Sequence, residues 1–186
     1  MNISFVNDFS KNKDVPMSED QILPFLNSIG KTVDKLVLST VLFLGISDKE
    51  LTGIRWSDID FTEQNIKIFD GRLKRIRIAY GPLSFFEALQ DYKKRSNTEN
   101  GLVFPFTKYQ FNRMLDDATK GFFGETRTWH AMRLSYLKSA AKKLTLQMVS
   151  ENMGVSPSQL MKYFNTDSTK LKKALDTMIS KDGGPL

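Results

Sequence analysis

The sequence predicts a mainly α domain with one small antiparallel β-hairpin or sheet, an α+β class. Two capping boxes that begin helices are recognisable: Ser18 lies three residues before Gln21, and Ser47 lies three residues before Glu50. The strongest hairpin signal is Asp70-Gly71, between two short β-type segments. Of the 186 residues 40% are hydrophobic, 14 of them phenylalanine, so one domain with a substantial core is expected.

Three helices are predicted in the first part of the chain. One follows the first capping box and ends at Gly30, and the next runs from about Thr32 to Leu44 and is apolar enough to be the central core helix. Gly45 ends it, because glycine adopts the left-handed backbone at the end of a helix. A short helix then begins after Ser47, and Trp56–Asp60 is predicted to be a turn.

The middle of the chain is predicted to form the sheet. Residues 65–69 and 73–80 are short strands joined by the turn at Asp70-Gly71. A helix beginning at Pro82 follows them, and Leu102–Phe104 is a candidate third strand. These elements and the helices after them fit a single domain of residues 16–180, with residues 1–15 as an N-terminal arm and residues 181–186 as a disordered tail.

The second strand of the hairpin carries two arginines. Ile76 and Ile78 alternate with Arg75 and Arg77, so we expect the isoleucines to be buried and the arginines exposed. Such a basic face suits duplex DNA, because cations that contact phosphates release counterions; an ordinary solvated strand is the alternative. We predict that DNA is bound by Arg72, Lys74, Arg75 and Arg77 and, more weakly, by the helical lysines Lys138, Lys142 and Lys143.

The composition narrows the classes of partner and site. The net charge of +6 favours an anionic partner, nucleic acid first and an acidic membrane surface second. The chain has no cysteine and one histidine, which excludes disulfides and leaves little to bind zinc. No apolar run reaches membrane-spanning length, and no signal-peptide pattern begins the chain. We expect a cytoplasmic location, nucleoid-associated, or nuclear if the cell is eukaryotic.

The stretch from residue 128 to 164 holds the strongest candidate for a functional site. His130 and Arg133 lie three residues apart in a helical pattern and share one face, so both can donate to one phosphate. Gly154 ends the following helix, and Ser156-Pro157 begins another that carries Tyr163. The alternative is that the histidine and the tyrosine are ordinary structural residues.

Taken in order, these segments resemble the catalytic domain of the tyrosine recombinases, the phage-integrase family, from about residue 15 onward. Leu42–Asp60 is similar to the family block LLLTGLRxSELLxLRWSDID. Thr128–Arg133 is similar to the H-x-x-R box, and Met153–Tyr163 to the box LGHSS…Y. The basic hairpin lies where the family has its own.

The resemblance implies a metal-independent and cofactor-independent chemistry on double-stranded DNA. In the family a tyrosine attacks a phosphodiester, forms a 3′-phosphotyrosyl link and releases a 5′-hydroxyl, and fixed cations hold the charge of the transition state. Here Tyr163 matches the nucleophile, His130 and Arg133 match the H-x-x-R box, and Lys74 is the nearest residue to the hairpin lysine. The resemblance also implies assembly of copies of the chain on DNA.

Three family positions differ in this sequence. The first arginine falls at Ser47, the hairpin lysine falls at Gly71 or Arg72, and the second histidine is replaced by Val155. We therefore expect a divergent recombinase or integrase of a mobile element with an incomplete site and impaired strand cleavage. The first alternative is an inactive DNA-binding regulator or architectural protein of the same fold. The second is a basic helical protein unrelated to DNA.

Overall fold

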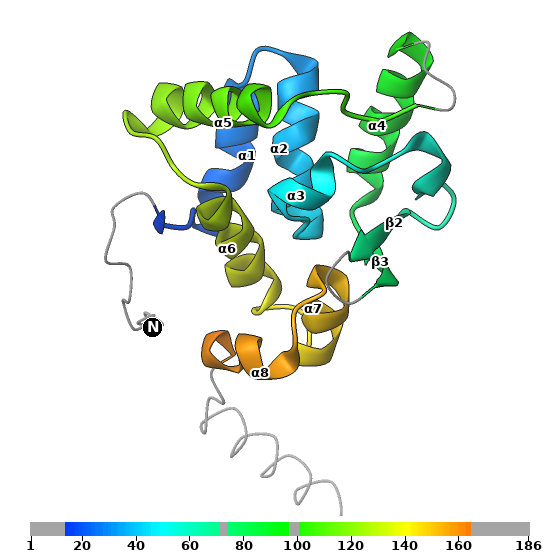
Figure 1. Ribbon diagram of the computed structural model, residues 1–186. Coiled ribbons are helices and arrows are strands. Elements are labelled where there is room, and N and C mark those ends of the chain that lie inside the picture. Colours follow the sequence, from blue (N-terminus) through cyan, green and yellow to red (C-terminus); the bar gives the residue numbers. More distant parts are fainter. Residues whose placement is uncertain (1–13, 71–73, 97–100, 165–186) are drawn as a thin grey trace, which may run out of the picture.

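The computed structural model describes residues 14–70, 74–96 and 101–164 (Figure 1). Within these ranges the fold is helical with one three-stranded antiparallel sheet, which confirms the predicted class. No helix in the described ranges is long and apolar enough to cross a membrane. The predicted residues Gly71 and Arg72, most of the N-terminal arm, and everything after Phe164 lie outside the described residues.

The first three helices follow the capping signals. The α1 helix (Glu19–Ser28) begins with the predicted capping box, α2 spans Thr32–Leu44 as predicted, and α3 is the short helix Asp48–Leu51. Gly45 ends α2 with a φ of 66°, a left-handed conformation that glycine adopts without steric cost. Most of α2 is buried, because it packs against α1, α4 (Leu83–Ser96) and α6 (Trp129–Ala140) in the centre of the domain.

The sheet has the strand order β1-β2-β3, with β1 Ile59–Asp60, β2 Asn65–Asp70 and β3 Arg75–Tyr80. The predicted third strand is wrong: β1 comes from the segment predicted as a turn, and Leu102 forms only an isolated bridge with Arg55. A 3₁₀ turn, Trp56–Asp58, precedes β1. The Asp58 carboxylate accepts a hydrogen bond from the Arg55 backbone N–H at 2.8 Å, which closes this turn and directs the chain onto β2.

Burial on β3 differs from the prediction at two positions, Ile76 and Arg77. Ile76 is 64% exposed and Arg77 only 7% exposed, whereas Arg75 is exposed as expected. Arg77 pairs with the buried Ile68 of β2 and lies on the same face of β3 as the buried Ala79. This face is turned toward α7 (Leu146–Met153), which packs beside β3 (Figure 1) and supplies a carbonyl partner for the buried guanidinium.

Five helices complete the described fold: α4 (Leu83–Ser96), α5 (Lys108–Phe123), α6 (Trp129–Ala140), α7 (Leu146–Met153) and α8 (Pro157–Leu160), the last followed by a 3₁₀ turn, Met161–Tyr163. The main apolar core contains residues of the helices from α1 through α6 and of the sheet. A second apolar cluster contains residues of α6, α7 and α8. Helix α6 contributes to both, so it connects the two parts of the domain.

The residues before α1 are tied to the start of α6. The Met17 side chain is fully buried, and its backbone N–H donates to Ser135 Oγ at 2.8 Å. Arg127 donates to the Val15 carbonyl at 3.0 Å, and the Thr128 hydroxyl donates to the Asp14 carboxylate. Residues 14 and 15, which we assigned to the arm, therefore contact the folded domain.

Candidate functional site

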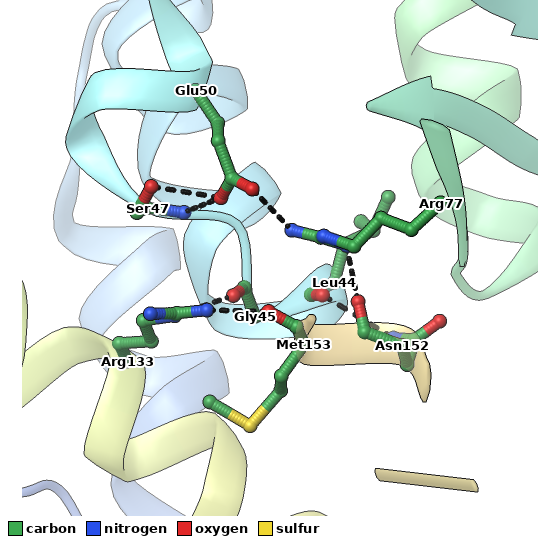
Figure 2. Close-up of polar contacts among 8 residues, drawn as sticks. All are labelled: Leu44, Gly45, Ser47, Glu50, Arg77, Arg133, Asn152 and Met153. Atoms are coloured by element: carbon green, nitrogen blue, oxygen red, sulfur yellow. Dashed lines mark hydrogen bonds and ion pairs between the residues drawn. The ribbon is translucent and has the colours of Figure 1, made fainter. Parts of the chain in front are cut away.

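Arg133 is held where the ends of two helices meet α6. Its Nε donates to the Gly45 carbonyl at 2.7 Å, and its Nη2 donates to the Met153 carbonyl at 2.5 Å (Figure 2). Gly45 ends α2 and Met153 is the last residue of α7, so both carbonyls are available because helices leave their last C=O groups without backbone partners. The half-buried guanidinium is therefore fixed in one orientation before any ligand binds.

Ser47 is fully engaged as the N-cap of α3. Its backbone N–H and its hydroxyl both donate to Glu50 Oε2, at 2.8 and 2.7 Å. The other oxygen of the same carboxylate, Oε1, accepts a hydrogen bond from Arg77 Nη2 at 3.0 Å (Figure 2). Position 47, where the resemblance places an arginine, thus carries a neutral side chain with a local structural role.

Arg77 is a buried cross-link between three elements. From β3 it reaches Glu50 in α3 and, through Nη1, the Asn152 carbonyl in α7. Its Nε is buried and has no hydrogen-bond partner among the described residues. The prediction that Arg77 faces outward to DNA beside Arg75 is wrong, because distant polar groups turn this face of β3 inward.

Asn152 is a residue of this cluster that the sequence analysis missed. Its Nδ2 lies within hydrogen-bond reach of the carbonyls of Leu44 and Tyr80, at 3.2 and 3.3 Å, and of Tyr136 Oη at 2.8 Å. Its Oδ1 accepts from the Tyr80 backbone N–H at 2.6 Å. Burial raises the pKa of the Tyr136 hydroxyl, while the Asn152 hydrogen bond acts in the other direction. An asparagine near a helix end is common, so the pattern alone gave no signal for this role.

His130 and Tyr163 lie in less constrained places than Arg133. His130 is exposed in the first turn of α6, with no hydrogen bond to any described residue. Tyr163 is half-buried in the 3₁₀ turn after α8, where it packs against the second apolar cluster and Lys162 Nζ lies 5.0 Å from its ring centroid. Its hydroxyl likewise has no hydrogen-bond partner within the described ranges. That the three residues act together stays a prediction.

The predicted DNA-binding residues other than Arg77 differ in their exposure and in their ion pairing. Lys74 and Arg75 are exposed at the start of β3, so they are free to meet a polyanion. Lys142 and Lys143 follow α6 and form exposed ion pairs with Glu19 of α1, at 3.4 and 2.5 Å. The hydrogen bond from Lys143 is the main reason that the pKa of Glu19 is lowered. Lys138, the remaining candidate for DNA binding, is half-buried on α6.

The described residues offer little for a metal or a small ligand of high charge. They contain no group of three or more His, Cys, Asp or Glu side chains that could hold a metal ion. A groove of about 1150 Å³ lies between α1, α2, α6, α7 and β3, and its lining includes the exposed side chains of Ile76 and Tyr80. Its lining is mostly apolar, so it does not resemble a phosphate site.

Comparison with known proteins gives matches by fold. No family model matches the sequence, and no curated protein matches it. The crystal structure of XerA recombinase matches with a TM-score of 0.72 and 21% identity, over 95% of this chain and 68% of XerA. The Tn1549 transposon integrase in complex with transposon right end DNA matches with a TM-score of 0.73 and 18% identity, over 97% of this chain and 70% of the integrase.

A third solved structure, XerH site-specific recombinase bound to its difH substrate, matches with a TM-score of 0.71 and 18% identity. The match covers 89% of this chain and 55% of XerH. This chain therefore spans only part of each of these proteins. At such identities the likeness establishes the fold.

Proposed function

We propose that this chain, which has the catalytic-domain fold of the tyrosine recombinases, binds duplex DNA and cleaves and rejoins its strands slowly through Tyr163. The observation that carries the proposal is the fixed guanidinium of Arg133, which two backbone carbonyls hold inside the H-x-x-R box. Exposed Lys74 and Arg75, with the net charge of +6, supply attraction for a polyanion. This activity takes place on cellular DNA, at the nucleoid or in a nucleus. Copies of the chain assemble on that DNA.

In the proposed reaction, Tyr163 Oη attacks the phosphorus of one phosphodiester. The new bond is a 3′-phosphotyrosyl ester, and the bond that breaks joins phosphorus to the 5′-oxygen, which leaves as a hydroxyl after it takes a proton. The tyrosine proton is given up in the same step, because a neutral hydroxyl is a weak nucleophile. Attack by the 5′-hydroxyl on the phosphotyrosine reverses the step, rejoins the strand and regenerates Tyr163.

Slow cleavage follows from the charges that the site holds. The transition state spreads negative charge over the phosphate oxygens, which fixed donors must stabilise. Arg133 is fixed and His130 is one turn away on α6, but the cap formed by Ser47 and Glu50 adds no cation. Removal of one preorganised donor lowers a rate by roughly 10²–10³-fold. We therefore propose a rate well below that of a recombinase with a complete set of cations.

A second candidate function is DNA binding without cleavage, as in a regulator or an architectural factor. The Ser47 cap favours it, because the serine at this position is used entirely in local structure. The packing of the Tyr163 ring against the second apolar cluster is also compatible with a structural role. Fold alone does not decide between the two functions.

The test uses a library of nicked suicide duplexes, in which cleavage releases a short strand and traps the covalent protein–DNA adduct. Wild-type protein is expected to form an adduct that survives a denaturing gel, and Tyr163→Phe none. Tyr109→Phe is the matched control, because Tyr109 is 74% exposed on α5, and it is expected to behave as wild type.

Three results would change this account. An adduct that persists in Tyr163→Phe contradicts the assignment of the nucleophile. Cleavage by wild-type protein as fast as that of a recombinase with all its cations contradicts the proposed slow rate. Salt-dependent binding of duplex DNA with no wild-type adduct supports the non-cleaving function instead.

A further inference from the structure

We propose that Arg77 is a positioning residue for Arg133: it holds the C-terminal end of α7, and α7 in turn aligns the Arg133 guanidinium. Arg77 itself does not contact the DNA. The catalytic consequence rests on the proposed function, but the structural relation between the two arginines does not.

The two guanidinium groups bind neighbouring carbonyls of one helix end. Arg77 donates to the carbonyl of Asn152, and Arg133 donates to the carbonyl of Met153 (Figure 2). The negative end of a helix dipole attracts cations, and the last carbonyls of a helix have no backbone partners within it. A displacement of the end of α7 would therefore move the oxygen that orients Arg133.

The backbone at the end of α7 leaves room for the Arg77 side chain. Gly154 has a φ of +65°, and a Cβ atom there would lie 2.6 Å from both Cδ and Nε of Arg77. Gly45, whose carbonyl binds Arg133, has a φ of +66°, and a Cβ atom there would lie 2.9 Å from Met153 Cγ. Gly154 thus allows the close approach of Arg77 to the end of α7, and Gly45 allows the Met153 side chain to pack closely against the end of α2.

Glu50 fixes the other side of the Arg77 guanidinium. The ion pair between Arg77 Nη2 and Glu50 Oε1 measures 3.0 Å, and both side chains are mostly buried. Oε2 of the same carboxylate holds the Ser47 cap at the start of α3. Because Arg77 is planar and has several fixed donors, it can hold α3 and α7 at once, whereas a lysine would present a single point of charge.

The test measures the Arg133 Nε–H group directly by NMR of protein with ¹⁵N-labelled arginine. Its resonance is assigned by its loss in Arg133→Lys, and its exchange with solvent is compared between wild type and variants. In Arg77→Met the resonance is expected to shift and its exchange to accelerate by at least about tenfold, because loss of the Met153 contact at Nη2 lets the guanidinium move and weakens the hydrogen bond from Nε–H to the Gly45 carbonyl. Arg75→Met is the matched control, because Arg75 is exposed on the same strand, and it is expected to change neither quantity.

Two further variants keep the test decisive if Arg77→Met does not fold. Arg77→Lys retains the charge but loses the fork of donors, and Gly154→Ala displaces Arg77 without removing it. Both are expected to accelerate exchange at Arg133 Nε–H. Unchanged shift and exchange in folded Arg77→Lys and Gly154→Ala overturn the proposal.

A second measurement separates positioning from DNA contact. On the suicide substrate, Arg77→Lys is expected to lower the rate of adduct formation by at least about tenfold while the affinity for duplex DNA stays within about twofold. A loss of affinity with an unchanged rate of adduct formation in the bound complex would overturn the proposal. If wild-type protein forms no adduct, the proposed cleavage fails, and the NMR result still decides whether Arg77 positions Arg133.

Discussion

The corner between α2 and α3 and the strand β3 supply side chains to the same polar cluster, but different forces fix them. At the corner, Gly45, Ser47 and Glu50 lie within six residues: Gly45 has a left-handed backbone, and Ser47 and Glu50 bond each other in a capping box. On β3, the partners of Arg77 lie 27 and 75 residues away. Local sequence therefore determines the corner, whereas tertiary contacts determine which face of β3 is buried.

The largest expected effect compares the two arginines of β3. Arg77→Met should destabilise the fold by about 3–5 kcal/mol, because it leaves the mostly buried Glu50 without its cation. Arg75→Met should change the free energy of unfolding by less than about 0.5 kcal/mol, because Arg75 is exposed. Urea unfolding measures both, and equal costs would contradict the different burial of the two arginines.

The next effect concerns the room that Gly154 makes for Arg77. Gly154→Ala should cost about 1–2 kcal/mol from the left-handed backbone alone, and more because the new Cβ meets the Arg77 side chain. Gly121→Ala in α5 is the control, since its Cβ meets nothing within 4 Å, and it should stabilise the helix by about 0.5–1 kcal/mol. Thermal unfolding measures both, and a neutral Gly154→Ala would show that β3 is not held at this point.

A smaller effect tests the corner. Ser47→Ala removes the N-cap hydroxyl of α3 and should cost about 1 kcal/mol. Thr107→Ala removes the equivalent hydroxyl at the start of α5, away from the cluster, and should cost a similar amount. A much larger loss for Ser47→Ala in chemical unfolding would show that the cap also supports the ion pair between Glu50 and Arg77, so that the corner is not fixed by local sequence alone.

The smallest effect is a pH dependence at Tyr136. Burial raises the pKa of its hydroxyl above the unfolded value near 10, so the folded state favours the neutral form. The stability that the neutral Tyr136 hydroxyl contributes is therefore complete below about pH 10 and is lost as the pH rises through the folded pKa. Tyr136→Phe should cost about 1 kcal/mol at pH 7 through the lost Asn152 contact, and the gap to wild type in urea unfolding should narrow above about pH 10. A constant gap would contradict this.

Sequence reasoning succeeded where the signals were local. The left-handed glycines Gly45 and Gly154 and the caps at Ser18 and Ser47 are recognisable within four or five residues, so the helix ends that they mark were predicted correctly. Period-two alternation placed residues on two faces of β3 but could not decide which face was inward. That choice depends on Asn152 and on other groups that only the folded chain brings together.

In the candidate site, too, only the features set by nearby residues were predictable. Ser47 was recognisable as a cap rather than a cation, and Arg133 was found from its spacing to His130. The carbonyls that orient Arg133 belong to residues 88 and 20 positions away, and no spacing rule connects them. The strand β1 was missed for a related reason, because two residues are too few to show a period.

The salt dependence of duplex DNA binding tests most directly whether the exposed Arg75 contacts DNA while Arg77, buried on the same face of β3, does not. Affinity is measured by fluorescence anisotropy from low to physiological salt for wild type, Arg75→Gln and Arg77→Gln, after circular dichroism confirms that each is folded. Each phosphate contact contributes about −0.9 to the slope of log affinity against log salt. We expect Arg75→Gln to reduce the slope by about 0.9 and Arg77→Gln to leave it unchanged. A slope reduced in Arg77→Gln but not in Arg75→Gln would contradict this expectation.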